Sequence, residues 1–274
     1  MSDENRIKYL SVSKISAAQK CPEQLRFRYE EHIPEPSSGT FHLGKVVHGV
    51  LERALRKVTL GESLPSHQDM DDMVGVVWEE IRKDEEHREN FICWQWDEDD
   101  PEEVAREGAR DLVKLARTEV LEKIKPVFVE HDINMNLESD IGPFRIYGII
   151  DLMEEGGMIT DWKTAYGKVS DFARKQDVQI DGYGTWHHLY TKQPVAPMRK
   201  LFLVRRKGKQ PIVDVANYQV TEAHREWFKR IAGNVWKMVQ AKAYVPNPSG
   251  WWCSRDWCSF WGVCPQGQLY GQRK

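Results

Sequence analysis

The residues best suited to chemistry lie in the stretch GIIDLMEEGGMITDWKT, at positions 148–164. Asp151 falls near the end of one strand-like segment, and Asp161 and Lys163 fall on the next, after a tight connection. Residues two apart on a strand point to the same face, so Asp161 and Lys163 share one, and a hairpin can bring Asp151 beside Asp161. Two carboxylates and an ammonium would then converge, which suits a hard divalent ion and a phosphate group.

Other polar residues favour this interpretation over an ordinary hairpin with solvated charges. An apolar run at 148–150 leads up to the first aspartate, which makes a merely solvated carboxylate less natural. Gln179 and Tyr183 are four positions apart on a predicted helix and therefore share one helical face. His48 follows Gly44 by four positions on an amphipathic segment, where a structural role and a ligand role both stay open.

The cysteines form a second pattern. Three crowd into the tail with the spacing C-x4-C-x5-C, and a fourth, Cys21, lies near the N-terminus. Zinc sites usually use close pairs of ligands, whereas the ligands of an iron–sulphur cluster need only converge in space. Both a four-thiolate cluster and a zinc ion held by the trio with a histidine stay open, and Cys93 is expected to be a packing residue. The candidate cluster ligands are Cys21, Cys253, Cys258 and Cys264.

Composition limits the classes of function. The chain has 274 residues, a formal net charge of −3, 41% hydrophobic and 30% charged residues, and 11 tryptophans. These values suit a globular protein and exclude a disordered, collagenous or disulfide-dense chain. Apolar runs are too short to span a bilayer and no apolar signal core opens the sequence, so we expect a protein that is not secreted. The net negative charge means that DNA binding must come from local basic clusters.

The elements that position these residues are predicted as helices, then a strand-rich centre, then helices. Hydrophobic periodicity predicts helices over about 11–30, 41–60, 69–89, 101–125, 170–191 and 221–243. Alternating or β-branched segments predict strands at 127–138, 143–155 and 158–164, and a hairpin of 201–206 with 212–220. The segment 34–39, rich in proline and serine, predicts a loop.

Taken together, the motifs resemble those of RecB-type nucleases of the PD-(D/E)XK superfamily, in the subset that carries an iron–sulphur cluster. That subset includes the AddB nuclease, the iron–sulphur CRISPR-associated nucleases, and single-strand exonucleases of phages and eukaryotes. The gap of four residues between the first two cysteines of the trio departs from many members, which have two. The motifs run in family order over about residues 11–265, as Cys21-Pro22, Gly44…His48…Leu51-Glu52, Gly148…Asp151, Asp161-Trp162-Lys163-Thr164, Gln179…Tyr183 and Cys253…Cys258…Cys264.

The resemblance implies an α/β (α+β) fold with a restriction-endonuclease-like core, in which a mixed central sheet is flanked by helices. We expect one nuclease domain over 1–274. Its parts are a mainly helical region at 11–125, the catalytic sheet core at 126–220, and a final helix and Cys-rich tail at 221–274. The tail is expected to close a 4Fe-4S site together with Cys21.

The resemblance also implies roles for the candidate residues. The implied ligands of a catalytic Mg²⁺ or Mn²⁺ are His48, Asp151, Asp161 and the backbone carbonyl of Trp162. Asp151 and Asp161 are also the implied catalytic carboxylates, and Lys163 would position the attacking water. Gln179 and Tyr183 would support the substrate or the metal. Glu130 is interpreted as an ordinary strand-end charge, in preference to an added carboxylate beside the metal.

The implied reaction is metal-dependent hydrolysis of DNA, by an exonuclease acting on single strands or ends in recombination, repair or processing. A second basic group, Lys20, Arg26 and Arg28, lies beside Cys21. The tryptophans of the tail are expected to pack around the cluster in preference to stacking on bases. The candidate DNA contacts at a hairpin tip are Arg205, Arg206, Lys207 and Lys209.

Alternatives from other classes stay open. One is a non-catalytic iron–sulphur subunit that binds DNA in a helicase or CRISPR integration complex, and another is a zinc-stapled interaction module. Besides DNA, the expected partners are a helicase, recombination or CRISPR protein, and a homo-oligomer is compatible with the sequence. We expect a cytoplasmic or nucleoid-associated location, in the host cytoplasm if the chain is phage-encoded, and no membrane contact.

Overall fold

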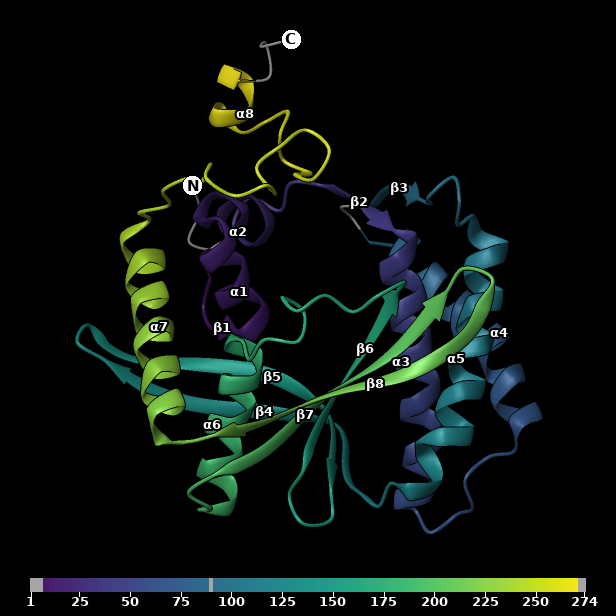
Figure 1. The fold of residues 1–274 in the computed structure, drawn as a ribbon. Helices are drawn as coiled ribbons and strands as arrows, with labels where there is room; N and C mark the ends of the chain where they lie inside the picture. The colour runs from purple at the N-terminus through teal and green to yellow at the C-terminus, as the bar shows by residue number, and fades with distance from the viewer. Residues whose placement is uncertain (1–6, 89–90, 271–274) are drawn as a thin grey trace.

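The structure, a computed structural model, describes residues 7–88 and 91–270. Its centre is a mixed six-stranded sheet (Figure 1). The strands are β1 (Leu10–Ser11), β4 (Pro126–Ser139), β5 (Gly142–Glu154), β6 (Ile159–Tyr166), β7 (Ala196–Arg206) and β8 (Lys209–Val220). Their order is β1-β5-β6-β7-β8, with β4 also paired to β5. The β1–β5 and β6–β7 pairs are parallel, and the other pairs are antiparallel.

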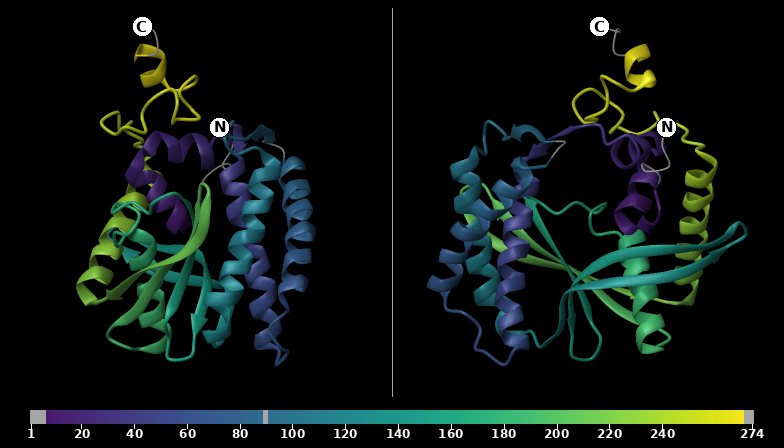
Figure 2. Two further views of the ribbon diagram at one scale, coloured as in Figure 1. Left: turned by 45° about the vertical axis from the view of Figure 1, so that its right-hand side comes forward. Right: turned by 180° about the vertical axis from the view of Figure 1, so that it is seen from behind.

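Helices cover both faces of this sheet (Figures 1 and 2). One group consists of α1 (Val12–Lys20), α2 (Pro22–Tyr29), α6 (Val178–Thr191) and α7 (Glu222–Ala241). The other consists of α3 (Gly39–Thr59), α4 (His67–Glu86) and α5 (Glu102–Glu119). Each group buries its own apolar core against the strands: on β7, Met198 belongs to the first core, and Leu201 and Leu203 to the second. The predicted mixed sheet flanked by helices is therefore confirmed.

Four of the predicted helices are found close to their expected bounds, as α3, α4, α5 and α7. The α3 helix shows why: Val47, Val50 and Leu51 recur on one helical face, and all are buried in the core with α4 and α5. A single 3₁₀ turn (Leu121–Lys123) follows α5, and a short helix α8 (Pro265–Tyr270) lies in the tail. Across the described residues, no helix combines the length and apolar composition needed to cross a bilayer.

Three predicted elements are wrong. The helix at 11–30 is two helices, because Pro22 has no N–H to continue α1 and holds the preceding Cys21 in an extended conformation, at φ −161°. The predicted loop at 34–39 is a strand, β2 (Glu35–Ser38), which pairs with a strand missed by the sequence, β3 (Phe91–Gln95). Periodicity within either segment gives no sign of so distant a partner. The helix predicted at 170–191 begins only at Val178.

Close packing of α6 on the sheet generates a stability prediction. A Cβ at Gly184 would lie 2.4–2.6 Å from side-chain atoms of Val220, whereas a Cβ at Gly233 on α7 would meet only Ser139, at 3.7 Å. Gly184→Ala should therefore lower the free energy of unfolding by about 1–3 kcal/mol through overpacking. Gly233→Ala should raise it by ~0.5–1 kcal/mol through helix propensity. Urea unfolding of both variants measures this contrast, and equal effects would contradict it.

Candidate active site

The candidate site lies where the backbone pairing between β5 and β6 ends. Their antiparallel register pairs Leu152 with Thr160, and one further step in that register sets Asp151 opposite Asp161. No backbone pairing is made at this step, and the carboxylate Oδ2 of Asp151 instead accepts the backbone N–H of Trp162, at 2.7 Å. The side chain thus satisfies a strand donor where the ladder ends, and the acidic residues lie at the opening.

The backbone of β4 is irregular beside this opening. Ile133 packs in the core with α1, α6 and α7, whereas Val129, which strict alternation would place on the same face, packs in the core with α3, α4 and α5. Between them Glu130 has φ +46°, a left-handed conformation that is costly for a residue other than glycine. The β4–β5 register sets Glu130 opposite Asp151.

A cluster of possible metal ligands forms at this irregularity. One donor atom from each of His48, Glu130 and Asp151 lies within 4.8 Å of the others, and Nδ1 of His48 is 3.7 Å from Oδ2 of Asp151. Glu130 therefore lies within β4 beside the other possible ligands, and not at a strand end as expected from the sequence. Its only signal in the sequence is the polar run 130–132, which interrupts the alternation of an otherwise regular strand.

The α3 helix can deliver His48 because it approaches β6 closely. A Cβ at Gly44 would lie 3.1 Å from the hydroxyl oxygen of Thr164, so a larger residue there would push the helix away from the strand. Leu51, one turn beyond His48, is fully buried in the apolar core that holds α3 against the sheet. The spacing of glycine, histidine and leucine on this helix therefore sets how near the imidazole comes to the carboxylates.

The predicted residues of β6 and α6 form one chain of polar contacts. Lys163 Nζ donates to Oδ1 of Asp161 at 2.9 Å and lies 2.8 Å from its Oδ2. The same ammonium donates to Oε1 of Gln179 at 3.1 Å, and Nε2 of Gln179 donates to the hydroxyl of Tyr183 at 3.3 Å. The face-sharing expected within each pair, Asp161 with Lys163 and Gln179 with Tyr183, is present.

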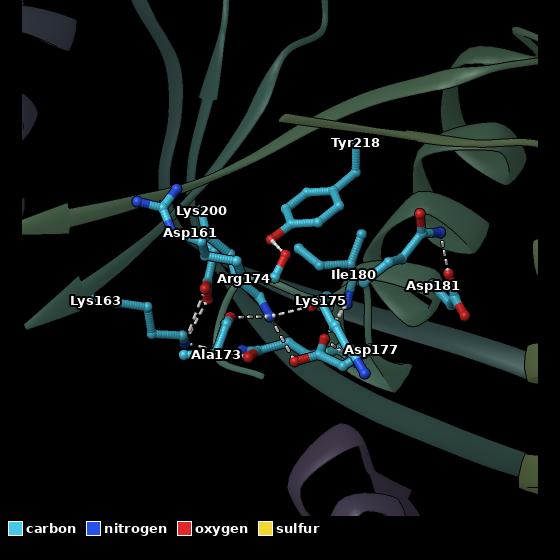
Figure 3. Close-up of polar contacts among 12 residues, drawn as sticks. Asp161, Lys163, Ala173, Arg174, Lys175, Asp177, Ile180, Asp181, Lys200 and Tyr218 are labelled. Atoms are coloured by element: carbon cyan, nitrogen blue, oxygen red, sulfur yellow. Dashed lines mark hydrogen bonds and ion pairs between the residues drawn. The ribbon is translucent and has the colours of Figure 1, made fainter. Parts of the chain in front are cut away.

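A residue missed by the sequence, Lys200, holds the start of α6 in place (Figure 3). Its buried ammonium donates to the backbone carbonyls of Ala173 and Lys175 and, at 2.6 Å, to the carboxylate of Asp177. Asp177 in turn caps α6 by accepting the N–H groups of its first turn. Carbonyls that a helix would use are thus bonded to Lys200, which explains why the helix starts later than predicted and why Gln179 faces Lys163.

Burial sets the protonation states of the acidic groups. It raises the pKa of Asp161 and of Asp151 to about 6, against the opposing attraction of Lys163. Burial and the nearby carboxylate of Asp151 raise the pKa of Glu130 to about 8. Burial opposes the charge of Lys163, but Asp161 and Asp151 outweigh it and raise its pKa. Lys163 is therefore a proton donor in hydrogen bonds at neutral pH, not a base.

The imidazole of His48 is neutral at the same pH. Burial and the ammonium of Lys163 lower its pKa to about 4, although Asp161 and a hydrogen bond with the backbone of Trp162 act in the opposite direction. A neutral imidazole offers a lone pair to a metal. The backbone of Trp162 lies within hydrogen-bond distance of the same imidazole. Imidazole, carboxylate and carbonyl donors fit Mg²⁺ or Mn²⁺, and binding would relieve the buried negative charge. This cluster opens into a cavity of about 780 Å³ lined also by Lys163 and Glu52.

Part of the positive charge predicted at the tip of the β7–β8 hairpin is paired with other groups of the same chain. Arg205 donates to both carboxylate oxygens of Asp100, at 2.9 and 3.0 Å, and is mostly buried. Arg206 donates to the backbone carbonyl of Gln210. Lys207 and Lys209 are exposed, although Lys207 lies 3.8 Å from a carboxylate of Asp99. The structure therefore leaves fewer free charges at this tip than the sequence indicates.

The cysteines of both ends converge. Burial and then the neighbouring thiols of Cys258, Cys21 and Cys264 raise the pKa of Cys253. Backbone and side-chain donors face two of the sulphurs: the N–H of Asn247 approaches Cys21 Sγ at 3.4 Å, and Nε2 of Gln24 approaches Cys258 Sγ at 3.3 Å. The four cysteines are thus neighbours at the corner between α1 and α2, although no three of their sulphurs lie within 4.8 Å of one another.

One expectation about this region is wrong, because Cys93 is exposed and is not a packing residue. The tail tryptophans differ from one another: Trp251 and Trp257 are 68% and 65% exposed and contact each other edge to face, whereas Trp252 and Trp261 are half-buried. The aromatic residue that seals the corner is Phe260, which is fully buried against Phe27.

Comparison with known proteins agrees with this geometry. A profile of the PD-(D/E)XK nuclease superfamily matches residues 9–265. The chain belongs to this superfamily. Membership indicates a nuclease, and nucleases of this superfamily use divalent metals such as Mg²⁺. A search of proteins with curated functions found no significant match.

A solved structure resembles this chain in fold. A crystal structure from Eubacterium rectale, named as a "putative exonuclease", covers 92% of this chain with 92% of its own length, at 13% identity and a TM-score of 0.55. A crystal structure named SSO0001 covers 97% of this chain with 88% of its own length, at 12% identity and a TM-score of 0.40. At this level of identity the first likeness supports the fold alone.

The raised pKa of Glu130 predicts how stability depends on pH without metal. A carboxyl whose pKa rises from 4.5 to about 8 on folding contributes stability that is present below 4.5 and lost as the pH rises through 8. His48, with its lowered pKa, contributes in the opposite sense only below about 6.5. In EDTA, the Tm of the parent should therefore fall between pH 6.5 and 8.5, and that of Glu130→Gln should fall less.

Glu138→Gln, an exposed change on the same strand, is the matched control and should follow the parent. Thermal unfolding across this pH range measures all three proteins. Parallel curves for the parent and Glu130→Gln would show that Glu130 has no such buried interaction with the acidic cluster.

Proposed function

We propose that this chain is a divalent-metal-dependent DNA exonuclease, acting on single strands or DNA ends in recombination, repair or processing. The observation that carries the proposal is the partly buried chain of hydrogen bonds from Asp161 through Lys163 to Gln179 and Tyr183, beside the cluster that contains His48 and Asp151. A surface hairpin with solvated charges would not bury two carboxylates against one ammonium. The likeness in fold to the Eubacterium rectale protein is consistent with an exonuclease.

We assign the following roles at the site. His48, Asp151, Asp161 and the carbonyl of Trp162 would hold the catalytic metal, with Glu130 as an added carboxylate. The metal, when bound, would activate water for attack and offset the charge of the phosphate. Lys163, which keeps its proton, would orient the attacking water and stabilise negative charge that develops on the phosphoryl oxygens. Gln179 would hold Lys163 in place, and Tyr183 would support Gln179.

We further propose that Cys21, Cys253, Cys258 and Cys264 hold a 4Fe-4S cluster. The convergence of four thiols from both ends of the chain supports this, since cluster ligands must meet in space whatever their separation in sequence. The N–H groups that face Cys21 and Cys258 would stabilise thiolate charge. Such a cluster would tie the tail to the corner between α1 and α2.

The alternative is a non-catalytic iron–sulphur subunit that binds DNA beside a helicase or CRISPR integration protein. The arrangement of His48, Asp151, Asp161 and Lys163 favours the enzyme, because a scaffold has no need of buried carboxylates that repel each other. A helicase or recombination partner remains part of the proposal for the biological setting.

The first test separates the enzyme from the scaffold. Asp161→Asn and Lys163→Met should each slow the cleavage of end-labelled DNA at least ~100-fold, equivalent to ~3 kcal/mol of barrier, because each removes stabilisation of the reacting phosphate. Lys168→Met, an exposed change on the loop after β6, is the control and should cut at the parental rate. The parent should need Mg²⁺ or Mn²⁺ and be inactive in EDTA or Ca²⁺. Parental rates in both site variants, or full cleavage in EDTA, would favour the scaffold.

The second test concerns the tail. Protein purified without oxygen should be brown, absorb broadly near 400 nm and contain about four irons per chain. Cys21→Ser should lose this iron, whereas Cys93→Ser, a change at an exposed cysteine outside the group, should keep it. Stoichiometric zinc without iron in the parent would refute the iron–sulphur cluster and support the zinc site.

A further inference from the structure

A second cavity, of about 970 Å³, lies on the other side of Gln179 from the acidic cluster. It is formed by β1, α1, α2 and the segment of β5 around Tyr147, and its floor reaches Gln179 and Tyr183. Neither this cavity nor its lining residues belong to the metal cluster described above. The two cavities are joined through Lys163, which lines the first and bonds to Gln179, which lines the second.

The charge of this second cavity is opposite to that of the whole chain. Lys8, Lys14, Lys20 and Arg28 line it, and no aspartate or glutamate does among the residues that the structure describes. Within the same residues, Lys8, Lys14 and Lys20 make no ion pair with a carboxylate, whereas Arg28 is paired with Glu35. In a protein of net charge −3, unpaired lysines around one hollow create a local attraction for anions.

Aromatic rings alternate with these charges. Tyr9, Tyr29 and Tyr147 line the cavity, and the rings of Tyr9 and Tyr147 meet edge to face with centroids 6.0 Å apart. Lys14 Nζ lies 3.8 Å above the ring of Tyr9. Lysines beside partly exposed tyrosine rings are the chemistry of single-stranded nucleic acid binding: ammonium groups contact phosphates, and ring faces stack on unpaired bases.

Close packing of β5 places the cavity beside the reacting groups. Gly148 lines the cavity, and a Cβ there would approach Ile133 at 3.2 Å and the ring of Tyr183 at 3.4 Å. The absent side chain lets β5 pack closely on Tyr183, which also lines the cavity and accepts a hydrogen bond from Gln179. A phosphate that follows the lysines past Tyr183 would reach Lys163 and then the acidic cluster.

We propose that this lysine–tyrosine cavity binds the single-stranded polynucleotide that leads up to the cut phosphate. The inference rests on the proposed nuclease function and adds the path of the substrate: the uncut strand lies along α1 and α2, and the cut end lies toward the acidic cavity beside α3. A duplex would use the lysines but not the tyrosines, because its bases are already stacked on one another.

The test measures binding apart from cleavage. Fluorescence anisotropy with a labelled oligothymidylate in EDTA compares the parent with Lys8→Gln/Lys20→Gln, two exposed residues whose side chains have no hydrogen-bond or ion-pair partner among the described residues. Loss of two phosphate contacts should weaken binding about tenfold and lower the slope of log K against log salt by ~1.4. Tyr147→Leu should weaken the binding of the single strand more than the binding of a blunt duplex of equal length. The control Lys83→Gln/Lys114→Gln makes the same charge change on exposed helix positions of α4 and α5 and should bind as the parent does.

The outcomes separate this inference from the proposed function. Parental affinity and salt slope in Lys8→Gln/Lys20→Gln, or an equal loss in the control, would overturn the cavity as the binding site. Equal losses for duplex and single strand in Tyr147→Leu would overturn its preference for unpaired bases. Hydrolysis of bis(p-nitrophenyl) phosphate by the parent with Mn²⁺ tests the nuclease alone, so a protein that binds as expected but hydrolyses nothing would refute the enzyme and keep the binding site.

Discussion

Burial of negative charge at the parting of β5 and β6 is the constraint on which the rest of the structure depends. Asp161 is 1% exposed, and the ammonium of Lys163 serves both it and the neighbouring Asp151. Charges in a low-dielectric interior are costly unless they are paired, and here two carboxylates share one counter-ion. The raised pKa values of both aspartates express this cost. A divalent cation would remove it, so the fold holds the site in a form that favours metal binding.

Packing outside the site keeps these groups where they are. The two apolar cores on opposite faces of the sheet supply the stability against which charge is buried. Two close contacts then fix the distances: Gly44 allows α3 to lie against Thr164, and Lys200 ties the loop before α6 to the sheet. Each contact acts on one side of the site, α3 through His48 and α6 through Gln179. Neither touches the reacting groups itself.

Local pattern predicts the parts of this site that depend on strand or helix periodicity. Asp161 and Lys163, or Gln179 and Tyr183, share a face by spacing alone, and the hairpin turn follows from the residues between β5 and β6. What pattern misses depends on partners far away in the chain. Glu130 joins the cluster through a left-handed backbone, and Arg205 is neutralised by Asp100. The pairing of β2 with β3 is missed for the same reason. The break in the first helix, in contrast, could have been predicted from Pro22.

The position of the cysteine group connects the tail to the path proposed for the substrate. Asn247 contacts both Cys21 and the backbone carbonyl of Lys20, and Phe260 is buried against Phe27. These contacts end at the corner between α1 and α2, whose residues line the lysine–tyrosine cavity, while the acidic cluster lies on β4, β5 and α3. A cluster held there would order the wall that holds the strand, with no contact to the reacting groups. The fold thus places the proposed strand binding and the attachment of the tail together at α1 and α2, and keeps both apart from the acidic cluster on α3, β4 and β5.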